Sequence, residues 1–357
     1  MELFIAFAFW LHIYKIMLIL AIETSCDETA AAVVEDTKVL SSIKWTQEIH
    51  SQWGGIVPSL AKRDHEARIE SIINQALADA KSTKDNIGAV AVTVGPGLAI
   101  ALEVGIKWAK KLAQEWHKPL IGINHIEGHI LSSLTPEVRF PCMALVVSGG
   151  HTQIIRVDEI GKYKILAQSL DDDIGEALDK GARMLGLPYP GGPALEKLAA
   201  QGDPKKYKLP LPMAGREGRA FSYSGLKTAF YRLINQVGGP SASSGLSADQ
   251  KADLASSYQA MVFKHLVRTL RLIINNSELA IRDLLAGGGV AANMKLREEI
   301  KKLSDEAGLN VHYPANLMLC TDNAVMVGIA AGFKAARGEF ADPEKIDRLP
   351  RWRVDEK

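Results

Sequence analysis

The sequence predicts an α/β protein built from two related lobes. Strand-like apolar runs alternate with helix-like runs along most of the 357 residues, and two short motifs recur in the same order. At roughly 150 residues per domain, this length accommodates two domains. Hydrophobic residues make up 47% of the chain and charged residues 23%, as in soluble globular proteins. This composition excludes disordered, collagen-like and coiled-coil classes.

Each lobe is predicted to begin with a strand, a short polar turn and a second strand, at 18–23 and 30–35 and again at 143–147 and 152–157. A strand that enters a helix through a glycine-containing turn then follows in each lobe. The other predicted strands are 89–94, 120–123 and 283–286, and the predicted helices are 59–80, 99–116, 175–185, 248–274, 293–306 and 322–336. We therefore expect a first lobe at 17–139, a second lobe at 140–338 and a tail at 339–357.

The first 16 residues are almost entirely apolar and lead into a second apolar run that begins at Met17. Together the two runs reach the length of a membrane helix, about 20 residues. His12 and Lys15 interrupt them, and Glu2 has the wrong charge for the start of a signal peptide. We interpret residues 1–16 as a dispensable extension, with a peripheral membrane or partner contact and a true anchor as alternatives.

Charge and cysteine content bound the class of protein further. The net charge is +1, from 42 basic and 41 acidic side chains, so a uniformly basic nucleic-acid-binding surface is not expected. The 3 cysteines are far apart and form no C-x-x-C pair, which fits a reducing compartment. We expect a cytoplasmic protein without stable membrane association.

Residues 202–245 form a Pro-, Gly- and Ser-rich insertion outside the repeat, and its end is typical of a flexible loop. It combines basic residues (Lys205, Lys206, Lys208, Arg216, Arg219, Lys227 and Arg232) with aromatic ones (Tyr207, Phe221, Tyr223 and Phe230). Cations that bind phosphates and rings that stack on bases suit RNA. The alternative is a solvated insertion whose aromatic side chains lie in the core.

Small residues follow several predicted strands, where backbone N–H groups can approach an anion closely. The run VSGG at 147–150 ends a strand, and an ordinary hairpin turn is its alternative. The glycines at 287–289 join a strand to a helix whose N-terminus favours phosphate, and GGP at 191–193 precedes a further helix. Neither the P-loop pattern nor the Rossmann pattern matches.

His125 and His129 are four residues apart, so on a helix they lie on one face within reach of a single metal ion. Two imidazoles suit Fe, Zn, Ni or Co, and Asp322, at a predicted helix start, can supply a carboxylate ligand. A capping or surface pair is the alternative. Glu127 does not complete an H-E-x-x-H motif, so a metalloprotease would lack its general base in the expected place.

An acidic run at 171–173 leads into a predicted helix, where an N-cap or dipole partner is the ordinary role. Asp179, one turn inside that helix, can accept hydrogen bonds from a ribose or bind Mg²⁺.

Together these segments resemble the tRNA N6-adenosine threonylcarbamoyltransferase family, which includes the bacterial TsaD proteins and archaeal and eukaryotic relatives. Ten motifs match in order between Met17 and about Gly338: AIETSCDET at 21–29, GGIVPSLAKRDH at 54–65, VGPGL at 94–98, HIEGH at 125–129, VSGGHTQ at 147–153, GEALDK at 175–180, YPGGP at 189–193, FSYSGLKT at 221–228, GGGVAAN at 287–293 and CTDN at 320–323. The run at 221–228 is similar to the bacterial and mitochondrial branch.

The resemblance implies an actin/hexokinase/Hsp70-like (ASKHA) fold, with a nucleotide cleft between two duplicated lobes. It implies transfer of the L-threonylcarbamoyl group from threonylcarbamoyl-AMP to N6 of the adenosine 3′ of the anticodon, in tRNAs reading ANN codons. The products are N6-threonylcarbamoyladenosine and AMP. A mixed anhydride is already activated, so a metal and backbone N–H donors can support the transfer without a covalent enzyme intermediate.

Site residues follow from the same resemblance. His125, His129 and Asp322 are expected to bind one divalent metal, Fe²⁺ first, with Zn²⁺ or Mg²⁺ as alternatives. Glu23 is the acidic residue nearest the expected reaction centre, and Lys227 is the candidate for tRNA contact. The adenylate site, which can also take ATP, is expected to be lined by Val146, Val147, Ser148, Gly149, Gly150, Asp179, Gly192, Glu196 and Asn293. Val146 stands where archaeal relatives have a metal-binding tyrosine, and Glu196 stands where the family often has Asp or Ser.

The implied partners are tRNA, an upstream synthase of threonylcarbamoyl-AMP, a paralogous ASKHA subunit (TsaB-like) and a small ATPase (TsaE-like). Three other functions stay open from the residues. A small-molecule kinase of the same fold would share the glycine turns but would not need the His125, His129 and Asp322 set. A metal-dependent peptidase and a nucleotide-regulated scaffold without turnover are the other two.

Overall fold

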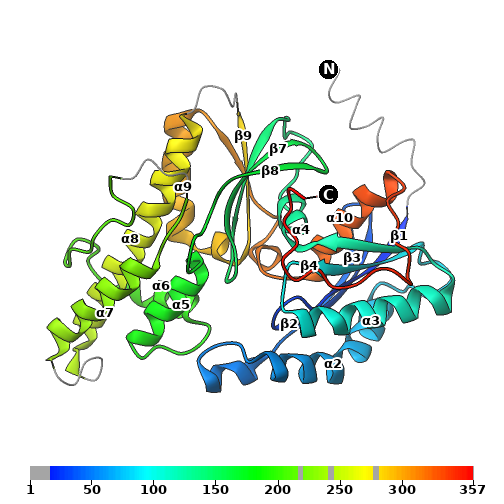
Figure 1. Ribbon diagram of the computed structural model, residues 1–357, viewed down its shortest axis with the longest axis horizontal. Coiled ribbons are helices and arrows are strands. Elements are labelled where there is room, and N and C mark those ends of the chain that lie inside the picture. The colour runs from blue at the N-terminus through cyan, green and yellow to red at the C-terminus, as the bar shows by residue number, and fades with distance from the viewer. Residues whose placement is uncertain (1–16, 216–219, 240–244, 276–280, 357) are drawn as a thin grey trace. The chain divides into compact units, whose positions relative to one another are not determined.

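The computed structural model describes residues 17–215, 220–239, 245–275 and 281–356, which divide into two units (Figure 1). Among them, unit 1 comprises residues 17–50, 56–138 and 314–356, and unit 2 comprises 51–55 and 139–313 without the gaps. Each unit contains a five-stranded mixed sheet flanked by helices, which confirms the α/β class. The predicted extension at 1–16, and Arg216 and Arg219 of the basic insertion, lie outside the described residues.

The sheet of unit 1 has the order β3-β2-β1-β4-β5. Its strands are β1 (Leu18–Glu23), β2 (Glu28–Glu35), β3 (Lys38–Thr46), β4 (Ala89–Gly95) and β5 (Leu120–Asn124). β1, β2 and β3 pair antiparallel, whereas β1, β4 and β5 pair parallel. Every residue of β4 is buried, as its unbroken apolar run requires of a central parallel strand.

Helices cover both faces of this sheet, because side chains of β1 alternate between them. They are α2 (Pro58–Asp79), α3 (Ala99–Trp116), α4 (His125–Leu131) and α10 (Ala324–Ala336). Leu20 belongs to a core cluster with Ile69 of α2 and Leu102 of α3, whereas Ala21 faces Gly328 of α10. Short 3₁₀ segments occur at Glu48–Trp53 and Leu317–Cys320.

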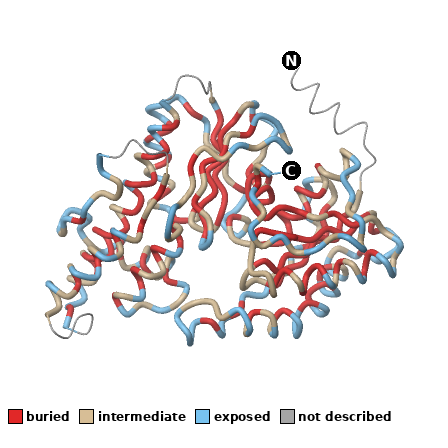
Figure 2. Tube along the Cα trace, in the orientation of Figure 1, coloured by how far each residue is buried: buried red, intermediate tan, exposed pale blue. Residues whose placement is uncertain are grey.

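The sheet of unit 2 has the order β10-β9-β6-β7-β8. Read from the other edge, the order of unit 1 is β5-β4-β1-β2-β3, so each strand of one sheet has a counterpart in the other. Its strands are β6 (Cys142–Val147), β7 (Thr152–Glu159), β8 (Lys162–Gln168), β9 (Asp283–Gly287) and β10 (Asn310–His312). β6 to β8 form an antiparallel meander, and β9 and β10 extend the sheet in parallel. The duplication predicted from the two recurring motifs is therefore confirmed. Figure 2 shows both sheets as buried layers.

Unit 2 contains the helices α5 (Ile174–Met184), α6 (Gly191–Ala199), α7 (Ser224–Gly238), α8 (Ala248–Ile274) and α9 (Met294–Ala307). α8 begins with a complete capping box, in which Ser247 and Gln250 satisfy each other's backbone N–H groups. α7 lies inside the segment interpreted from sequence as an insertion, so its central part is helical rather than irregular. A 3₁₀ turn at Gly289–Ala292 joins β9 to α9.

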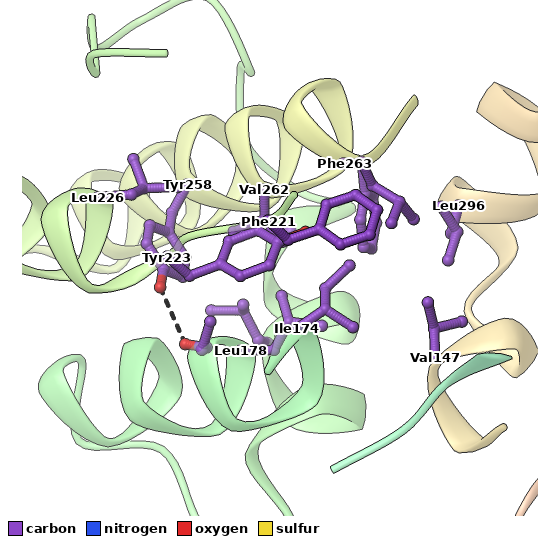
Figure 3. Packing of buried hydrophobic residues seen from close by; sticks show 14 of the residues in the cluster. Val147, Ile174, Leu178, Phe221, Tyr223, Leu226, Tyr258, Val262, Phe263 and Leu296 are labelled. Carbon is purple, nitrogen blue, oxygen red and sulfur yellow. Dashed lines mark hydrogen bonds between the residues drawn. The ribbon is translucent and has the colours of Figure 1, made fainter. Parts of the chain in front are cut away.

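Three aromatic side chains of that insertion lie in the core. Phe221, Tyr223 and Phe230 are each 0% exposed, and Figure 3 shows Phe221 and Tyr223 among buried hydrophobic side chains. The Phe230 ring stacks on Tyr258 of α8 at 4.2 Å between centroids. The hypothesis that these three rings stack on RNA bases is therefore wrong, and the alternative of a core role is confirmed. Burying such rings contributes more to folding than a surface position would allow.

Candidate metal and nucleotide sites

Helix α4 carries the two histidines of the predicted metal site. It begins directly after β5, where the Asn124 side chain accepts hydrogen bonds from the backbone N–H groups of Ile126 (2.9 Å) and Glu127 (3.3 Å). This cap satisfies two N–H groups that a helix start otherwise leaves unpaired. The rings of His125 and His129 lie on one face with centroids 4.7 Å apart, as the four-residue spacing predicts. All seven residues of α4 are buried, which restricts their rotamers.

Asp322 brings a carboxylate to the same place. It precedes α10, whose first turn is capped by Asn323, and its Oδ1 lies 3.1 Å from His129 Nε2 and 3.5 Å from His125 Nε2. α10 approaches α4 closely at Gly128, where a Cβ would lie 3.2 Å from Cγ of Met326. The three ligand atoms lie within 4.8 Å of one another. The structure thus assembles the three residues that the sequence singled out.

This arrangement fits a divalent transition metal. Two imidazole nitrogens and one carboxylate oxygen form a suitable donor set that leaves coordination positions open for substrate. A second contact orients the first ligand: His125 Nδ1 lies 3.3 Å from Glu23 Oε2 and 3.2 Å from Ser25 Oγ. Metal-binding histidines commonly have such a carboxylate on the far ring nitrogen. For His129, Nδ1 is buried and has no hydrogen-bond partner among the described residues.

The pKa values of the two imidazoles shift in opposite directions. Burial alone would lower the pKa of His125, but the carboxylates of Asp322 and Glu23 raise it to about 9. Burial also lowers the pKa of His129, and the charge on His125 lowers it further. Only a neutral imidazole can bind a metal, so a cation that binds here must displace a proton from His125.

Glu23 is fully buried at the end of β1. Burial opposes its ionisation, but the hydrogen bond and positive charge of His125 lower its pKa overall. Its carboxylate accepts hydrogen bonds from the Ser25 N–H and the Thr93 hydroxyl, both at 2.5 Å. These contacts hold Glu23 against a metal ligand, and its catalytic role stays a prediction.

Glu127 lies next to the metal residues in sequence but has a different partner. Its carboxylate lies 3.7 Å from Nζ of Lys334 in α10, and the same ammonium donates to the Gly122 carbonyl at 3.1 Å. An acid engaged with a lysine is unsuited to activate a water, which weighs against the peptidase alternative.

The segments expected to bind the adenylate converge in unit 2. The Ser148 carbonyl accepts a hydrogen bond from the Gly175 N–H at 3.2 Å, and a Cβ at Gly175 would lie 2.6 Å from that oxygen. Gly288 has φ +91°, and a Cβ there would lie 2.3 Å from the Val147 carbonyl oxygen. These positions accept only glycine, because the turns after β6 and β9 pack directly on their neighbours.

The polar residues predicted for this site bond to the backbone at the starts of neighbouring helices. Asp179 Oδ1 accepts a hydrogen bond from the Gly192 N–H at 2.8 Å, and Glu196 Oε1 accepts one from the Met294 N–H at 2.7 Å. Asn293 caps α9 by accepting from the Leu296 N–H at 3.0 Å. Val146 and Val147 are fully buried in β6, whereas Gly149 and Gly150 are exposed. The exposed backbone at 149–150 is the part of this set best placed to meet a ligand.

Lys227, the predicted tRNA contact, forms an ion pair inside unit 2. Its Nζ lies 2.6 Å from Asp172 Oδ2, and Lys180 lies 2.7 Å from the other oxygen of the same carboxylate. Although burial alone would raise the pKa of Asp172, these two ammonium groups lower it. By contrast, Lys205, Lys206 and Lys208 are exposed.

The acidic run at 171–173 has a role that sequence reasoning missed. Asp171 accepts hydrogen bonds from the hydroxyls of Ser222 (2.5 Å) and Ser224 (2.6 Å), and from the Tyr223 N–H (2.8 Å). It therefore attaches the start of α7 to the start of α5. Asp173 is the N-cap residue of α5 but makes no side-chain cap bond, and burial raises its pKa to about 6. The serine-rich run at 222–224 was the available signal, because hydroxyls and free backbone N–H groups pair with carboxylates.

Sequence comparison gives a consistent family assignment. The family model described as TsaD, tRNA N6-adenosine threonylcarbamoyltransferase, matches residues 38–329. A protein with this name from Anaeromyxobacter dehalogenans is 44% identical over 341 residues, covering 94% of this chain and 99% of the relative. One from Bartonella henselae is 43% identical over 358 residues, covering 96% of each.

Solved structures confirm the ASKHA fold at low sequence identity. HypF of T. kodakarensis superposes with a TM-score of 0.62 at 16% identity, covering 91% of this chain and 48% of that protein. Component A of (R)-2-hydroxyglutaryl-CoA dehydratase from Acidaminococcus fermentans gives 0.52 at 16% identity, covering 90% and 99%. At such identity these likenesses bear on the fold alone. In the described part of the chain, no helix has the length and apolarity needed to cross a membrane.

Proposed function

The chain belongs to the tRNA N6-adenosine threonylcarbamoyltransferase family and is therefore an acyl-transferring enzyme of tRNA modification; from this premise we propose its specific reaction. The L-threonylcarbamoyl group passes from threonylcarbamoyl-AMP to N6 of the adenosine 3′ of the anticodon in tRNAs that read ANN codons. The new N6–C bond forms as the bond between the carbamoyl carbon and the phosphate oxygen breaks. AMP leaves with that electron pair, and N6 loses a proton. The observation that carries the proposal is the His125, His129 and Asp322 set within a chain that matches the family over residues 38–329.

His125, His129 and Asp322 of unit 1 would hold the metal, for which we propose Fe²⁺, with Zn²⁺ or Mg²⁺ as alternatives. When bound, it supplies a Lewis acid that polarises an oxygen of the anhydride. Glu23 and Ser25 orient the His125 ring through Nδ1, so Nε2 stays directed toward Asp322. Fixed ligand geometry matters because the exocyclic amine of adenosine is a weak nucleophile and depends on orientation more than on a strong base.

Unit 2 would hold the adenylate. The exposed backbone of Gly149 and Gly150 and the hydroxyl of Ser148 offer hydrogen-bond donors to the phosphate. Donors already in place at the leaving group stabilise the charge that develops on AMP. Asp179 and Glu196 hold the α6 and α9 segments around this turn, and carboxylates are suitable acceptors for ribose hydroxyls. ATP would occupy the same residues as an alternative ligand.

Partners and location are proposed from family membership. tRNA is the acceptor, and we assign Lys227 and the exposed lysines at 205, 206 and 208 as candidates for its phosphates. The expected protein partners are the synthase of threonylcarbamoyl-AMP, a paralogous TsaB-like subunit and a TsaE-like ATPase. The three cysteines are free, which fits a reducing compartment, so a cytoplasmic enzyme is proposed.

Reconstitution tests the proposal. Protein starting at Met17 is incubated with threonylcarbamoyl-AMP and unmodified tRNA, with and without the two partner subunits, and the digested RNA is analysed by mass spectrometry. We expect N6-threonylcarbamoyladenosine in amounts equal to the AMP released. If no modified base forms with all partners present, the proposal fails. Release of ADP from ATP with a hydroxylated small molecule would instead support the kinase alternative.

A further inference from the structure

Residues 346–354 form a C-terminal strap that lies against the carboxyl ends of β4 and β5 in unit 1. The Leu349 N–H donates to the Val94 carbonyl at 2.7 Å, and the Pro350 carbonyl accepts from the Gly97 N–H at 3.2 Å. The Trp352 carbonyl accepts from Asn124 Nδ2 at 3.4 Å. Ile346 and Trp352 also pack against the hydrophobic core of this unit. The strap is therefore part of unit 1, although it follows the last helix.

One side chain joins the strap to the metal helix. Asn124 uses its amide oxygen to cap α4 through Ile126 and Glu127, and its amide nitrogen to hold Trp352 of the strap. Because the two ends of one planar amide move together, displacement of the strap rotates the cap. The cap fixes the first turn of α4, which begins with His125. Asn124 is 2% exposed, so water does not readily replace either partner.

A second connection reaches the helix that follows Asp322. Lys334 of α10 is paired with Glu127 at 3.7 Å, and its Nζ lies 5.4 Å from the centroid of the Trp352 ring. The strap thus contacts Asn124, the N-cap residue of α4, and Lys334 of α10. An ammonium over an indole face is an attractive contact.

The fit between the strap and the β4 turn is close. Gly95 has φ +156°, and a Cβ there would lie 1.9 Å from the Leu349 carbonyl oxygen. At Gly122, a Cβ would lie 3.0 Å from Cδ1 of Ile346. A cavity of about 560 Å³ nevertheless lies beside the strap, lined in part by Val94, Lys334 and Trp352. The named hydrogen bonds and the packing of Ile346 and Trp352 together attach the strap.

We propose that the C-terminal strap is a positioning element of the metal site, so that strap docking and metal binding stabilise each other. The proposal deepens the proposed function, because it rests on the metal site formed by His125, His129 and Asp322. Linkage is reciprocal. If docking of the strap favours the ligand geometry and so strengthens metal binding, metal binding must strengthen docking of the strap by the same factor. The strap acts through Asn124 and Lys334 and not by contact with substrate or metal.

Metal affinity measures this coupling without activity. Co²⁺ is titrated into protein starting at Met17, followed by its visible absorption, and compared with a variant that ends at Lys345. We expect the truncation to raise the Kd for Co²⁺ at least about fivefold, the lower end of ordinary coupling between sites. A control that ends at Val354 keeps the strap and should bind Co²⁺ like the full chain. A Kd within twofold of the full chain in the truncated protein overturns the proposal.

A point variant covers the case in which the truncated chain fails to fold. Leu349→Pro removes the N–H that bonds to Val94, and Leu349→Ala keeps it, so only the proline variant should weaken Co²⁺ binding. In the unaltered protein, saturating Co²⁺ should slow hydrogen exchange at the Leu349 and Gly97 amides. Equal exchange rates with and without Co²⁺, or equal affinities in the two variants, contradict the coupling.

The same titration separates this proposal from the proposed function. If the full chain binds Co²⁺, and His129→Ala abolishes binding but truncation of the strap leaves the Kd unchanged, only the strap proposal is overturned. If the full chain binds no Co²⁺ through His129, the metal site itself is absent, and both proposals fail. Loss of transferase activity with intact strap coupling would overturn only the proposed reaction.

Discussion

Glu23 Oε2 lies 3.3 Å from Nδ1 of His125, while the other nitrogen of the same ring lies 3.5 Å from Asp322. The buried imidazole is thus held between two carboxylates, which raise its pKa to about 9 against the effect of burial. One carboxylate belongs to the predicted ligand set and the other does not. A carboxylate on the far nitrogen of a ligating histidine fixes the ring and makes it a stronger donor.

This relationship predicts the effect of Glu23→Gln. The variant keeps the shape but removes the charge, so we expect the Kd for Co²⁺ to rise by roughly 10- to 100-fold, as for other such outer carboxylates. Equilibrium titration measures it, with Glu35→Gln at the half-buried far end of β2 as the control. Unchanged metal affinity together with lost transfer would show that Glu23 acts on the substrate instead.

Two glycines near the proposed adenylate site should behave differently when replaced. Gly288→Ala combines a positive φ with a contact of 2.3 Å to the Val147 carbonyl, and should lower the free energy of unfolding by about 2–4 kcal/mol. Gly149→Ala meets nothing within 4 Å, so its stability should change by less than about 0.5 kcal/mol while AMP binding weakens. Denaturant unfolding and calorimetric titration of AMP measure the two effects. Strong AMP binding by Gly149→Ala would exclude that backbone from the phosphate site.

His265 of α8 should make unit 2 sensitive to acid. Burial and the nearby Arg268 lower its pKa to about 4, and its Nε2 accepts the Ser222 N–H at 3.3 Å. An unfolded histidine titrates near about 6.5, so the unfolded state takes up its proton first as the pH falls. The stability that His265 contributes is thus complete above about pH 6.5 and is lost as the pH falls toward 4.

Urea unfolding at several pH values tests this dependence. His265→Gln cannot titrate, so it should lose less stability than the unaltered protein between pH 7 and pH 5. Parallel losses in the two proteins would mean that other groups cause the acid sensitivity.

Substitutions of Lys227 and of the exposed Lys205 should distinguish a lysine that stabilises the fold from one that binds tRNA. Lys227→Met leaves Asp172 with Lys180 alone, and should destabilise the protein by about 1 kcal/mol. Lys205→Met should leave stability unchanged, because this side chain is exposed. Affinity for tRNA at several salt concentrations then shows which lysine binds phosphate, since losing one contact reduces the salt slope by about 0.7–0.9. An unchanged slope for Lys227→Met would remove it from the RNA-binding surface.

Much of the fold followed from the sequence, for identifiable physical reasons. β1 and β4 are unbroken apolar runs, and α3 has strong helix formers between clear ends, so local pattern sufficed. α7 was less clear, because Gly and Ser residues nearby favour turns while its helical state depends on burying Phe230 against Tyr258. Tertiary packing outweighed local propensity there.

In the candidate site too, some contacts could be predicted from local sequence and others could not. His125 and His129 could be paired from their spacing, but Asp322 is 193 residues from His129, and only the order of motifs connected them. The serines at 222 and 224 indicate that a carboxylate can pair with them, but no local pattern identifies Asp171 as that partner or indicates that the strap reaches Asn124. Such contacts depend on where the chain returns in space, which periodicity does not encode.

The most direct test of the account compares the unaltered protein with Asp322→Ala in the complete reconstitution with threonylcarbamoyl-AMP and tRNA. Asp305→Ala, which changes an exposed acid of α9, serves as the matched control. We predict N6-threonylcarbamoyladenosine from the unaltered and control proteins, and a loss of at least about 100-fold in Asp322→Ala together with loss of bound metal. Undiminished modification by a metal-free Asp322→Ala protein would contradict the central claim that transfer depends on this site.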